Sequence, residues 1–155
     1  MARKEKLPFE TTLMVRDCCL CLHMQRAARN LARIFDDVLR PLDLTNGQFS
    51  LLMSLNRPKP AAMKSVASLL AMDRTTLTAA LKPLERRGLV TIAQDPDDGR
   101  SRLLELTQAG HDLLAEAFPL WQQTHADIER QFAPGEVDLL RGQLHALSQE
   151  PAARG

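Results

Sequence analysis

One stretch of the 155-residue chain, Asp73–Leu106, constrains the fold more than any other. It begins with Asp73, a residue type that often caps a helix, and its apolar residues then recur at helical spacing until Gly88, where a helix is expected to end. Two short runs, Val90–Ala93 and Arg102–Leu106, follow on either side of a polar segment with Asp-Pro and Asp-Gly pairs. Such pairs are turn signals, so the two runs are expected to form a hairpin. The stretch therefore predicts a basic helix followed by a two-stranded hairpin.

The residues before Asp73 predict a second short helix, from about Met63 to Leu70, joined to the first by a tight turn at Ala71-Met72. Two short helices in this arrangement, the second polar and basic on its outer face, describe a helix-turn-helix. With the hairpin appended, the motif becomes a winged helix-turn-helix. Its apolar side chains are expected to face inward, namely Met63, Val66, Ala67, Leu69 and Leu70 on the first helix, and Leu77, Ala80, Leu81 and Leu84 on the second.

The outer face of the second helix predicts contact with double-stranded DNA. Arg74 and small hydroxyl side chains on its first turns suit base edges in a major groove ~12 Å wide, and Lys82, Arg86 and Arg87 suit phosphates. At the hairpin tip, Arg100, oriented by Asp98, suits a narrow minor groove. The predicted DNA-binding residues are Lys64, Ser65, Arg74, Thr75, Thr76, Thr78, Lys82, Arg86, Asp98, Arg100 and Arg102.

The distribution of charge agrees with a polyanion-facing middle segment. Residues 57–102 carry nine basic and five acidic side chains, a net charge of +4, whereas residues 103–149 carry two basic and seven acidic, a net charge of −5. The chain shows no apolar run of about 18 residues and no signal peptide, so we expect a cytoplasmic protein that does not enter a membrane.

The remaining helices supply more apolar surface than one small winged domain needs. Asp17 to about Arg40 reads as one long amphipathic helix, and Thr45 is placed to cap a helix whose inner face holds Phe49, Leu52, Met53 and Leu55. A long helix follows Thr107, with a kink expected at Pro119, and the last helix carries Val137, Leu140, Leu144 and Leu147. A homodimer formed by both chain ends accounts for this surplus.

The predicted fold is therefore mainly α with a small antiparallel β-hairpin wing, a winged helix-turn-helix plus a helical dimerisation region. In chain order, residues 1–16 form an N-terminal arm, residues 17–43 and 107–148 the dimerisation region, residues 44–106 the DNA-binding lobe and residues 149–155 a flexible tail.

Four stretches in this order resemble the MarR (multiple antibiotic resistance regulator) family of bacterial winged-helix repressors. They are Leu44-Thr45 with Gln48-Phe49 and Leu51-Leu52, Asp73–Thr78, Leu84-Glu85 with Gly88–Val90, and Asp95-Pro96 with Asp98–Arg100 leading to Leu106-Thr107 and Gly110. The resemblance implies a dimer that represses transcription from a pseudo-palindromic operator. It also implies an effector pocket between dimer helices and DNA-binding lobes, for which aromatic acids, their thioesters, antibiotics and peroxides are all candidates. The chain departs from the family at Asp97, where a basic residue is common, and at Ala79-Ala80, so the operator sequence does not carry over.

The residues proposed for effector binding are His23, Met24, Phe49, Met53 and Trp121. Ordinary core packing is an equally good reading of Trp121. Redox sensing is an alternative function for Cys18, Cys19 and Cys21, because some relatives sense hydroperoxides through a cysteine in the first helix. A reactive thiol needs access and a depressed pKa, and the chain has no tyrosine to support the sensing thiol as in those relatives. Structural packing of the cysteines is therefore the favoured interpretation.

No enzyme, cofactor or metal site is expected. The four histidines include no close pair at metal-ligand spacing, and no glycine-rich phosphate loop or catalytic carboxylate pair is visible. A protein-interaction module that uses the helix-turn-helix without DNA is the alternative of another class, and the basic segment argues against it.

Overall fold

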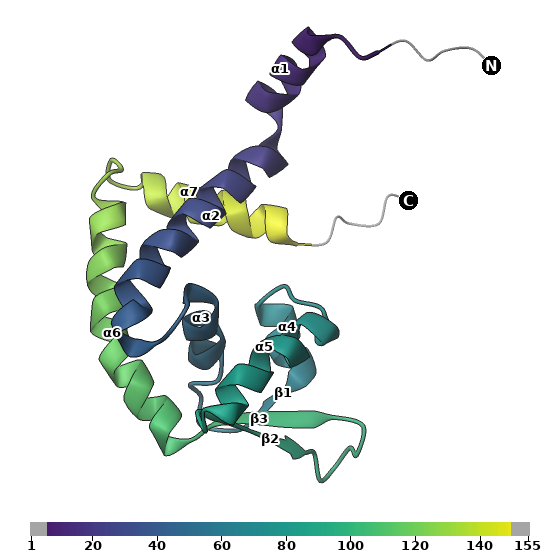
Figure 1. Ribbon diagram of the computed structural model, residues 1–155, viewed down its shortest axis with the longest axis vertical. Helices are drawn as coiled ribbons and strands as arrows, with labels where there is room; N and C mark the ends of the chain where they lie inside the picture. The colour runs from purple at the N-terminus through teal and green to yellow at the C-terminus, as the bar shows by residue number, and fades with distance from the viewer. Residues whose placement is uncertain (1–5, 150–155) are drawn as a thin grey trace, which may run out of the picture. The chain divides into compact units, whose positions relative to one another are not determined.

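The computed structural model describes residues 6–149, which divide between two units, Met1–Ile34 and Phe35–Gly155. The elements are mostly helices, with one small sheet (Figure 1). In the described part of the chain, no helix combines the length and apolar character needed to cross a membrane.

The N-terminal unit contains α1 (Phe9–Cys18) and the first part of α2 (Leu20–Leu39). The backbone at Cys19 is extended and separates the two helices, so the prediction of one helix from Asp17 is wrong. The N-terminal arm also contains a helix that we did not predict. Neither proline nor glycine stands at residue 19 to signal the break. α1 has no buried residue, which explains why apolar periodicity did not reveal it.

The second unit begins with the end of α2, the short 3₁₀ helix η1 (Arg40–Leu42) and α3 (Asn46–Ser54). Thr45 caps α3 as predicted, accepting from the Gln48 backbone N–H while the Gln48 side chain accepts from the Thr45 N–H. Met53, however, is 36% exposed and does not belong to the inner face. Helical spacing places it at the edge of that face beside Phe49.

The helix-turn-helix consists of α4 (Met63–Leu69) and α5 (Arg74–Arg86), and the turn between them passes through Ala71 in the left-handed region, with a φ of 51°. Leu77, Leu81 and Leu84 are fully buried as predicted. Leu69 is 62% exposed, so its predicted inward position is wrong. The core-facing side of α4 is defined by the buried Met63 and Val66 and by Leu70, which packs against the same core. α5 continues through Pro83, which is half-buried.

The predicted hairpin is confirmed as β2 (Val90–Gln94) paired antiparallel with β3 (Arg102–Leu106). A third strand, β1 (Ala61–Ala62), pairs with the other edge of β3 and gives the order β1-β3-β2. Sequence reasoning missed β1 because two residues are too few to show an alternating pattern. The central Leu104 is fully buried and joins this sheet to the core under α4 and α5.

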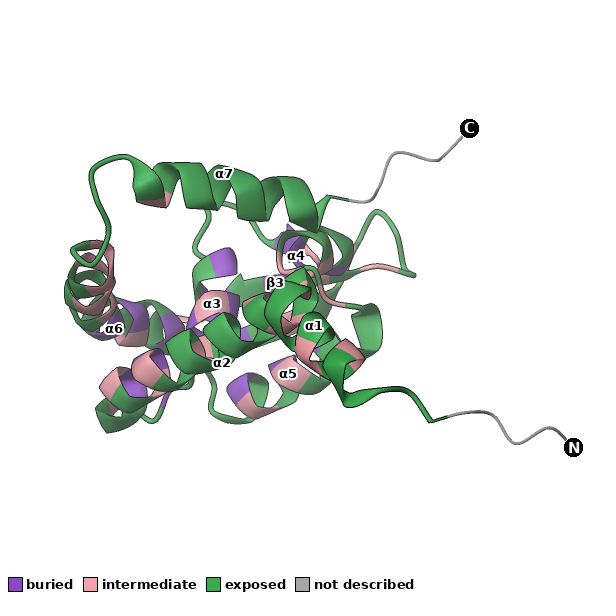
Figure 2. Ribbon diagram, turned by 90° about the horizontal axis from the view of Figure 1, so that it is seen from above, coloured by how far each residue is buried: buried purple, intermediate pink, exposed green. Residues whose placement is uncertain are grey.

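The C-terminal helices are α6 (Gln108–Glu129) and α7 (Glu136–Ser148). Thr107 caps α6 as predicted, and its hydroxyl also donates to the Gly88 carbonyl at 2.6 Å. α6 is unbroken at Pro119 and is curved in Figure 1. α7 has no buried residue and is exposed along most of its length in Figure 2. Of the predicted flexible tail, residues 150–155 lie outside the described residues.

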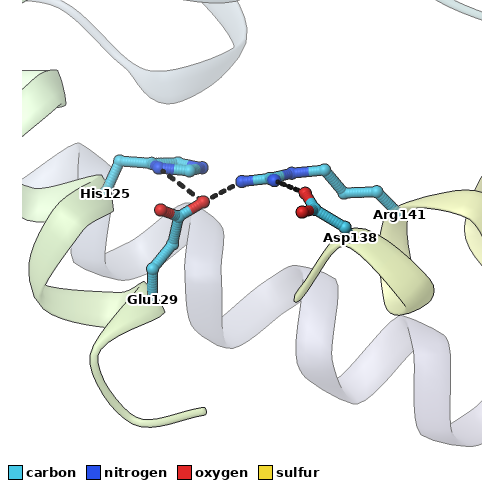
Figure 3. Close-up of polar contacts among 4 residues, drawn as sticks. All are labelled: His125, Glu129, Asp138 and Arg141. Carbon is cyan, nitrogen blue, oxygen red and sulfur yellow. Dashed lines mark hydrogen bonds and ion pairs between the residues drawn. The ribbon is translucent and has the colours of Figure 1, made fainter. Parts of the chain in front are cut away.

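A polar cluster joins α7 to the end of α6 (Figure 3). The Arg141 guanidinium of α7 pairs with Glu129 of α6 and also with Asp138, at 2.8 Å. His125 Nδ1 lies 3.4 Å from the same Glu129 carboxylate. The Arg141 and Asp138 side chains are at least half exposed, so these pairs contribute little to the stability of the fold.

Candidate nucleic-acid interface

The first turn of α5 is held by an acidic cap. Asp73 accepts from the Thr76 backbone N–H at 2.7 Å and from the Thr76 hydroxyl at 2.8 Å. The backbone hydrogen bond from Thr76 is the main reason that the pKa of Asp73 lies below its ordinary value, and the hydroxyl adds to it. The cap fixes the direction in which the helix begins, and with it the place of Arg74.

The predicted polar and basic residues lie on the exposed face of α5, but the hydroxyls of its threonines differ in their intramolecular hydrogen bonds. The hydroxyl of Thr76 is used by the cap, and that of Thr78 donates to the Arg74 carbonyl at 2.7 Å. Among the described residues, the Thr75 hydroxyl has no intramolecular hydrogen bond. Thr75 is therefore the threonine whose hydroxyl is free to contact an external partner.

A depression of about 360 Å³ brings α4, α5 and the wing together. We call it the basic depression, because four cationic side chains line it with a single carboxylate. Its lining residues are Met63, Lys64, Ala67, Arg74, Asp98, Arg100, Ser101 and Arg102. Segments that are well separated in the chain thus present one positive surface. Such a concave positive surface attracts a polyanion.

The wing tip is held by hydrogen bonds within itself, some between backbone groups and some between a side chain and the backbone. Asp95 N–H donates to the Ser101 carbonyl at 3.1 Å, and Gln94 Nε2 donates to the Gly99 carbonyl at 2.8 Å. Asp98 accepts from the backbone N–H of Arg100 at 3.0 Å, so it shapes the turn and does not hold the guanidinium as we had expected. The Arg100 side chain is exposed beside the depression.

The other predicted DNA-binding residues lie outside the basic depression. Ser65, Lys82 and Arg86 are all exposed, on α4 and α5. Arg87, which the sequence assigned to phosphate, instead donates from Nη1 to the Asp43 carbonyl at 2.6 Å. No sequence signal could have revealed a contact between residues 44 positions apart.

A second depression of about 430 Å³ is apolar and lies between α3, α4 and α6. It contains three of the predicted effector-binding residues, and its lining is Phe49, Ser50, Met53, Ser54, Leu69, Leu70, Phe118 and Trp121. The Trp121 ring stacks near four other rings, with centroids 6.4 Å from Phe35, 6.0 Å from Phe49 and Phe118, and 4.7 Å from His125. The other two predicted residues, His23 and Met24, lie on α2 in the N-terminal unit.

The three cysteines lie at the junction of α1 and α2. Cys18 and Cys21 are exposed, and Cys19 is half-buried. Within residues 6–149, no group of three or more His, Cys, Asp or Glu side chains is arranged to hold a metal ion.

Comparison with known proteins agrees with this geometry. The family model described as MarR family matches residues 44–101, which include α3, the helix-turn-helix, and the wing as far as the start of β3. The organic hydroperoxide resistance transcriptional regulator of Bacillus subtilis is 31% identical over 91 residues, which are 59% of this chain and 62% of that protein.

Solved structures match over a greater length. The transcriptional regulator MOSR of M. tuberculosis, in complex with DNA, is 34% identical, with a TM-score of 0.77 over 84% of this chain and 94% of that one. Bordetella bronchiseptica BpsR, whose DNA binding is regulated by 6-hydroxynicotinic acid, is 25% identical, with a TM-score of 0.76 over 85% of this chain and 94% of that one. Family model, sequence identity and fold agree, and the chain belongs to the MarR family of transcriptional regulators.

Proposed function

We propose that two copies of this chain form a homodimer that binds an operator in double-stranded DNA and represses transcription until an effector binds. The basic depression is the observation that carries this proposal. It joins Lys64 and Arg74 of the helix-turn-helix to Arg100 and Arg102 of the wing. With α5 in a major groove, Arg74 and Thr75 approach base edges and the wing reaches the adjacent minor groove. Lys82 and Arg86 then face phosphates.

Replacement of Arg100 by alanine tests this arrangement. We expect Arg100→Ala to weaken binding to a duplex from the chain's own promoter region by roughly ten- to a hundredfold at fixed salt, because a specific arginine contact is lost. Arg130→Ala is the matched control, since it removes one exposed arginine from the end of α6, where Arg130 pairs with Asp127. Equal affinity of the Arg100 variant and the wild type in a titration would refute the wing's role.

Dependence on salt separates DNA binding from the protein-interaction alternative. Each phosphate contact releases counterions, so log affinity should fall linearly with log salt, with a slope of about −0.9 per contact. Binding that is insensitive to salt would favour the alternative.

Exposed apolar side chains on the terminal helices support a dimer built from the chain ends, with residues 17–43 and 107–148 as the dimerisation region. α7 exposes Leu139, Leu140, Leu144 and Leu147, with Leu139 and Leu147 more than half exposed. α1 and α2 expose Phe9, Met14, Val15, Leu20 and Leu31. Apolar side chains gathered on helices in this way are typical of an interface. We expect chains that start at Asp17 or end at Ala133 to dimerise poorly in sedimentation experiments, and a stable, DNA-competent monomer from either would contradict the assignment.

The apolar depression is the proposed effector site, with Phe49, Met53 and Trp121 around the ligand. Because Trp121 is the sole tryptophan, its fluorescence reports on this site directly. We expect an aromatic probe such as 6-hydroxynicotinic acid or salicylate to quench it and to weaken operator binding. A ligand shifts the equilibrium only through different affinities for the two states.

A bulky substitution at Ser50, which is half-buried in the lining, sharpens that experiment. Ser50→Leu should abolish the response to the probe while ligand-free operator binding persists, and Ser50→Ala, which adds no bulk, should respond like the wild type. A full response in Ser50→Leu would place the effector elsewhere. His23 and Met24 stay predictions, to be tested by alanine variants in the same titration.

A thiol-based mode of regulation is the second candidate, favoured by the exposure of Cys18 and Cys21. Exposed thiols can be oxidised, provided that they ionise. If they regulate the protein, a hydroperoxide should release operator DNA and dithiothreitol should restore binding. A variant with serine at Cys18, Cys19 and Cys21 should then be resistant, and equal sensitivity of this variant would end the proposal.

A further inference from the structure

Two adjacent arginines at the end of α5 have different surroundings. Arg86 and Arg87 are both exposed, and by sequence both suit DNA phosphates. The Arg86 guanidinium has no hydrogen-bonded partner among the described residues. Arg87 donates from Nη1 to the Asp43 carbonyl at 2.6 Å, and its Nη2 lies 3.5 Å from the Leu42 carbonyl. The planar guanidinium fork thus faces two successive carbonyls of the segment between α2 and α3.

That segment, residues 40–45, is held in a defined shape that we call the connector. Asp43 adopts a left-handed φ of 53°, and its N–H donates to the Arg40 carbonyl at 2.9 Å. Leu44 follows and is buried, at 3% exposure. On the other side, Asp36 of α2 accepts from the Asn46 N–H at 2.6 Å, which fixes the start of α3. The left-handed turn at Asp43 is therefore the local conformation on which the Arg87 contact depends.

The other end of this contact is equally well held. Arg87 is the C-cap of α5, and its N–H donates to the Pro83 carbonyl at 3.1 Å. Gly88 then reverses the chain with a φ of 69°, which a residue with a side chain rarely adopts. Arg87 therefore links two ordered segments, and its guanidinium already has intramolecular hydrogen-bond partners.

We propose that Arg87 is a positioning residue for operator recognition, which fixes the C-terminal end of α5 to the connector. The inference rests on the proposed function, because two α5 helices in a dimer must match a spacing of ~34 Å on DNA. The connector leads from α2, a proposed dimerisation helix, to the DNA-binding lobe. A fixed contact between the connector and α5 limits how far the recognition helix can turn away from the spacing that the operator requires.

Alanine variants of the two arginines test this role against a phosphate contact. The probes are a duplex selected from a random pool by the wild-type chain and an unrelated duplex of equal length. We expect Arg87→Ala to weaken binding to the selected duplex about fivefold, as one exposed charged hydrogen bond allows, while affinity for the unrelated duplex and the salt slope stay unchanged. Arg86→Ala should weaken both and make the slope shallower by about 0.9. A shallower slope for Arg87→Ala, or unchanged affinity for the selected duplex, overturns the proposal.

Asp43 gives a second and independent pair of variants. Asp43→Gly tolerates the left-handed turn and should bind the selected duplex like the wild type, whereas Asp43→Val disfavours that turn and should reproduce the loss seen for Arg87→Ala. The double variant Arg87→Ala with Asp43→Val should be no weaker than either alone, because both remove one contact. Fully additive losses would contradict the proposal.

Hydrogen exchange provides a readout without DNA. Arg87→Ala should speed amide exchange in residues 40–45 and 84–89 while the rest of the lobe keeps its protection. Unchanged exchange there overturns the positioning role even if DNA binding is lost. If Arg87→Ala speeds exchange in these residues but the wild-type chain binds no DNA, the proposed function is rejected while the contact between Arg87 and the connector stands.

Discussion

The DNA-binding lobe and the last helix of the chain use their leucines in opposite ways. In α5, Leu77, Leu81 and Leu84 have no exposed surface, and they share one core with α3, α4 and the sheet. In α7, Leu139 is 64% exposed and Leu147 57%. Because an apolar side chain favours burial, the leucines of α7 are expected to gain their stabilising contacts only in an assembly. The lobe has its own core, whereas α7 leaves its leucines exposed to solvent.

The largest expected effect comes from opening the core of the lobe. Leu81→Ala should lower the free energy of unfolding by about 2–5 kcal/mol, because a fully buried leucine leaves a cavity that closes only in part. Chemical denaturation followed by circular dichroism measures this loss.

Leu144→Ala on α7 is the matched substitution in the other region, where Leu144 is 43% exposed. It should leave the unfolding of dilute monomer within about 0.5 kcal/mol of the wild type, as expected for an exposed site. Its effect should be seen in the concentration dependence of dimerisation, measured by sedimentation. Equal destabilisation of the monomer by both variants would show that α7 packs as a core helix, and the comparison would then fail.

Replacing two glycines by alanine should change the free energy of unfolding by smaller amounts and in opposite directions. A Cβ at Gly110 would lie 2.2 Å from the Leu89 carbonyl oxygen, where α6 crosses the end of the lobe. Gly110→Ala should therefore cost roughly 1–3 kcal/mol of stability, as overpacking does. A Cβ added at Gly142 on α7 would have no atom within 4 Å. Gly142→Ala should stabilise by about 0.5–1 kcal/mol through helix propensity. Thermal unfolding of both variants checks the pair, and a loss in Gly142→Ala would reveal an intramolecular neighbour for α7.

Sequence reasoning succeeded where the determinant is local. Thr45, Asp73 and Thr107 cap their helices because each side chain reaches an N–H three residues ahead. Gly88 ends α5 in the left-handed region for an equally local reason. The family likeness rests on these same short motifs.

Sequence reasoning failed where the determinant is distant or weak. The contact of Arg87 with Asp43 spans 44 positions, so no local sequence pattern predicts it. Leu69 is apolar and is expected to face inward, but it lies at the apolar depression. Met53 lies there too, although the sequence assigned it both to the inner face of its helix and to the effector-binding residues. Apolar type alone does not separate core from binding surface. The cationic lining of the basic depression could be named residue by residue, whereas its concave shape needed the packing of β3 against α4.

The smallest expected effects concern two exposed carboxylates, one in each unit. The pKa of Asp73 is lowered chiefly by the Thr76 backbone N–H. The pKa of Asp17 is lowered chiefly by the hydrogen-bonded Arg16 guanidinium, at 2.6 Å. A pKa below its unfolded value means that the ionised form stabilises the fold. That contribution is complete above the unfolded pKa and disappears as pH falls through the lower, folded pKa.

Salt distinguishes the two causes. The Arg16–Asp17 pair is exposed and charged on both sides, so 1 M salt, with a Debye length of about 3 Å, should move the pKa of Asp17 back toward its ordinary value. The cap of Asp73 depends on short hydrogen bonds to neutral groups, and its pKa should move less. NMR titration of the two carboxyl carbons at low and high salt measures both shifts.

Asp73→Asn adds a stability readout for the lobe alone. Asparagine keeps an acceptor for the Thr76 N–H but has no proton to gain, so the acid-dependent part of α5 stability that Asp73 contributes should vanish. The variant should therefore lose less stability than the wild type as pH falls through the folded pKa of Asp73. If the variant and the wild type lose stability equally as pH falls, other carboxylates cause that dependence.

For the salt titration, an equal response of Asp17 and Asp73 would mean that a neighbouring charge, and not the helix cap, lowers the pKa of Asp73 as well.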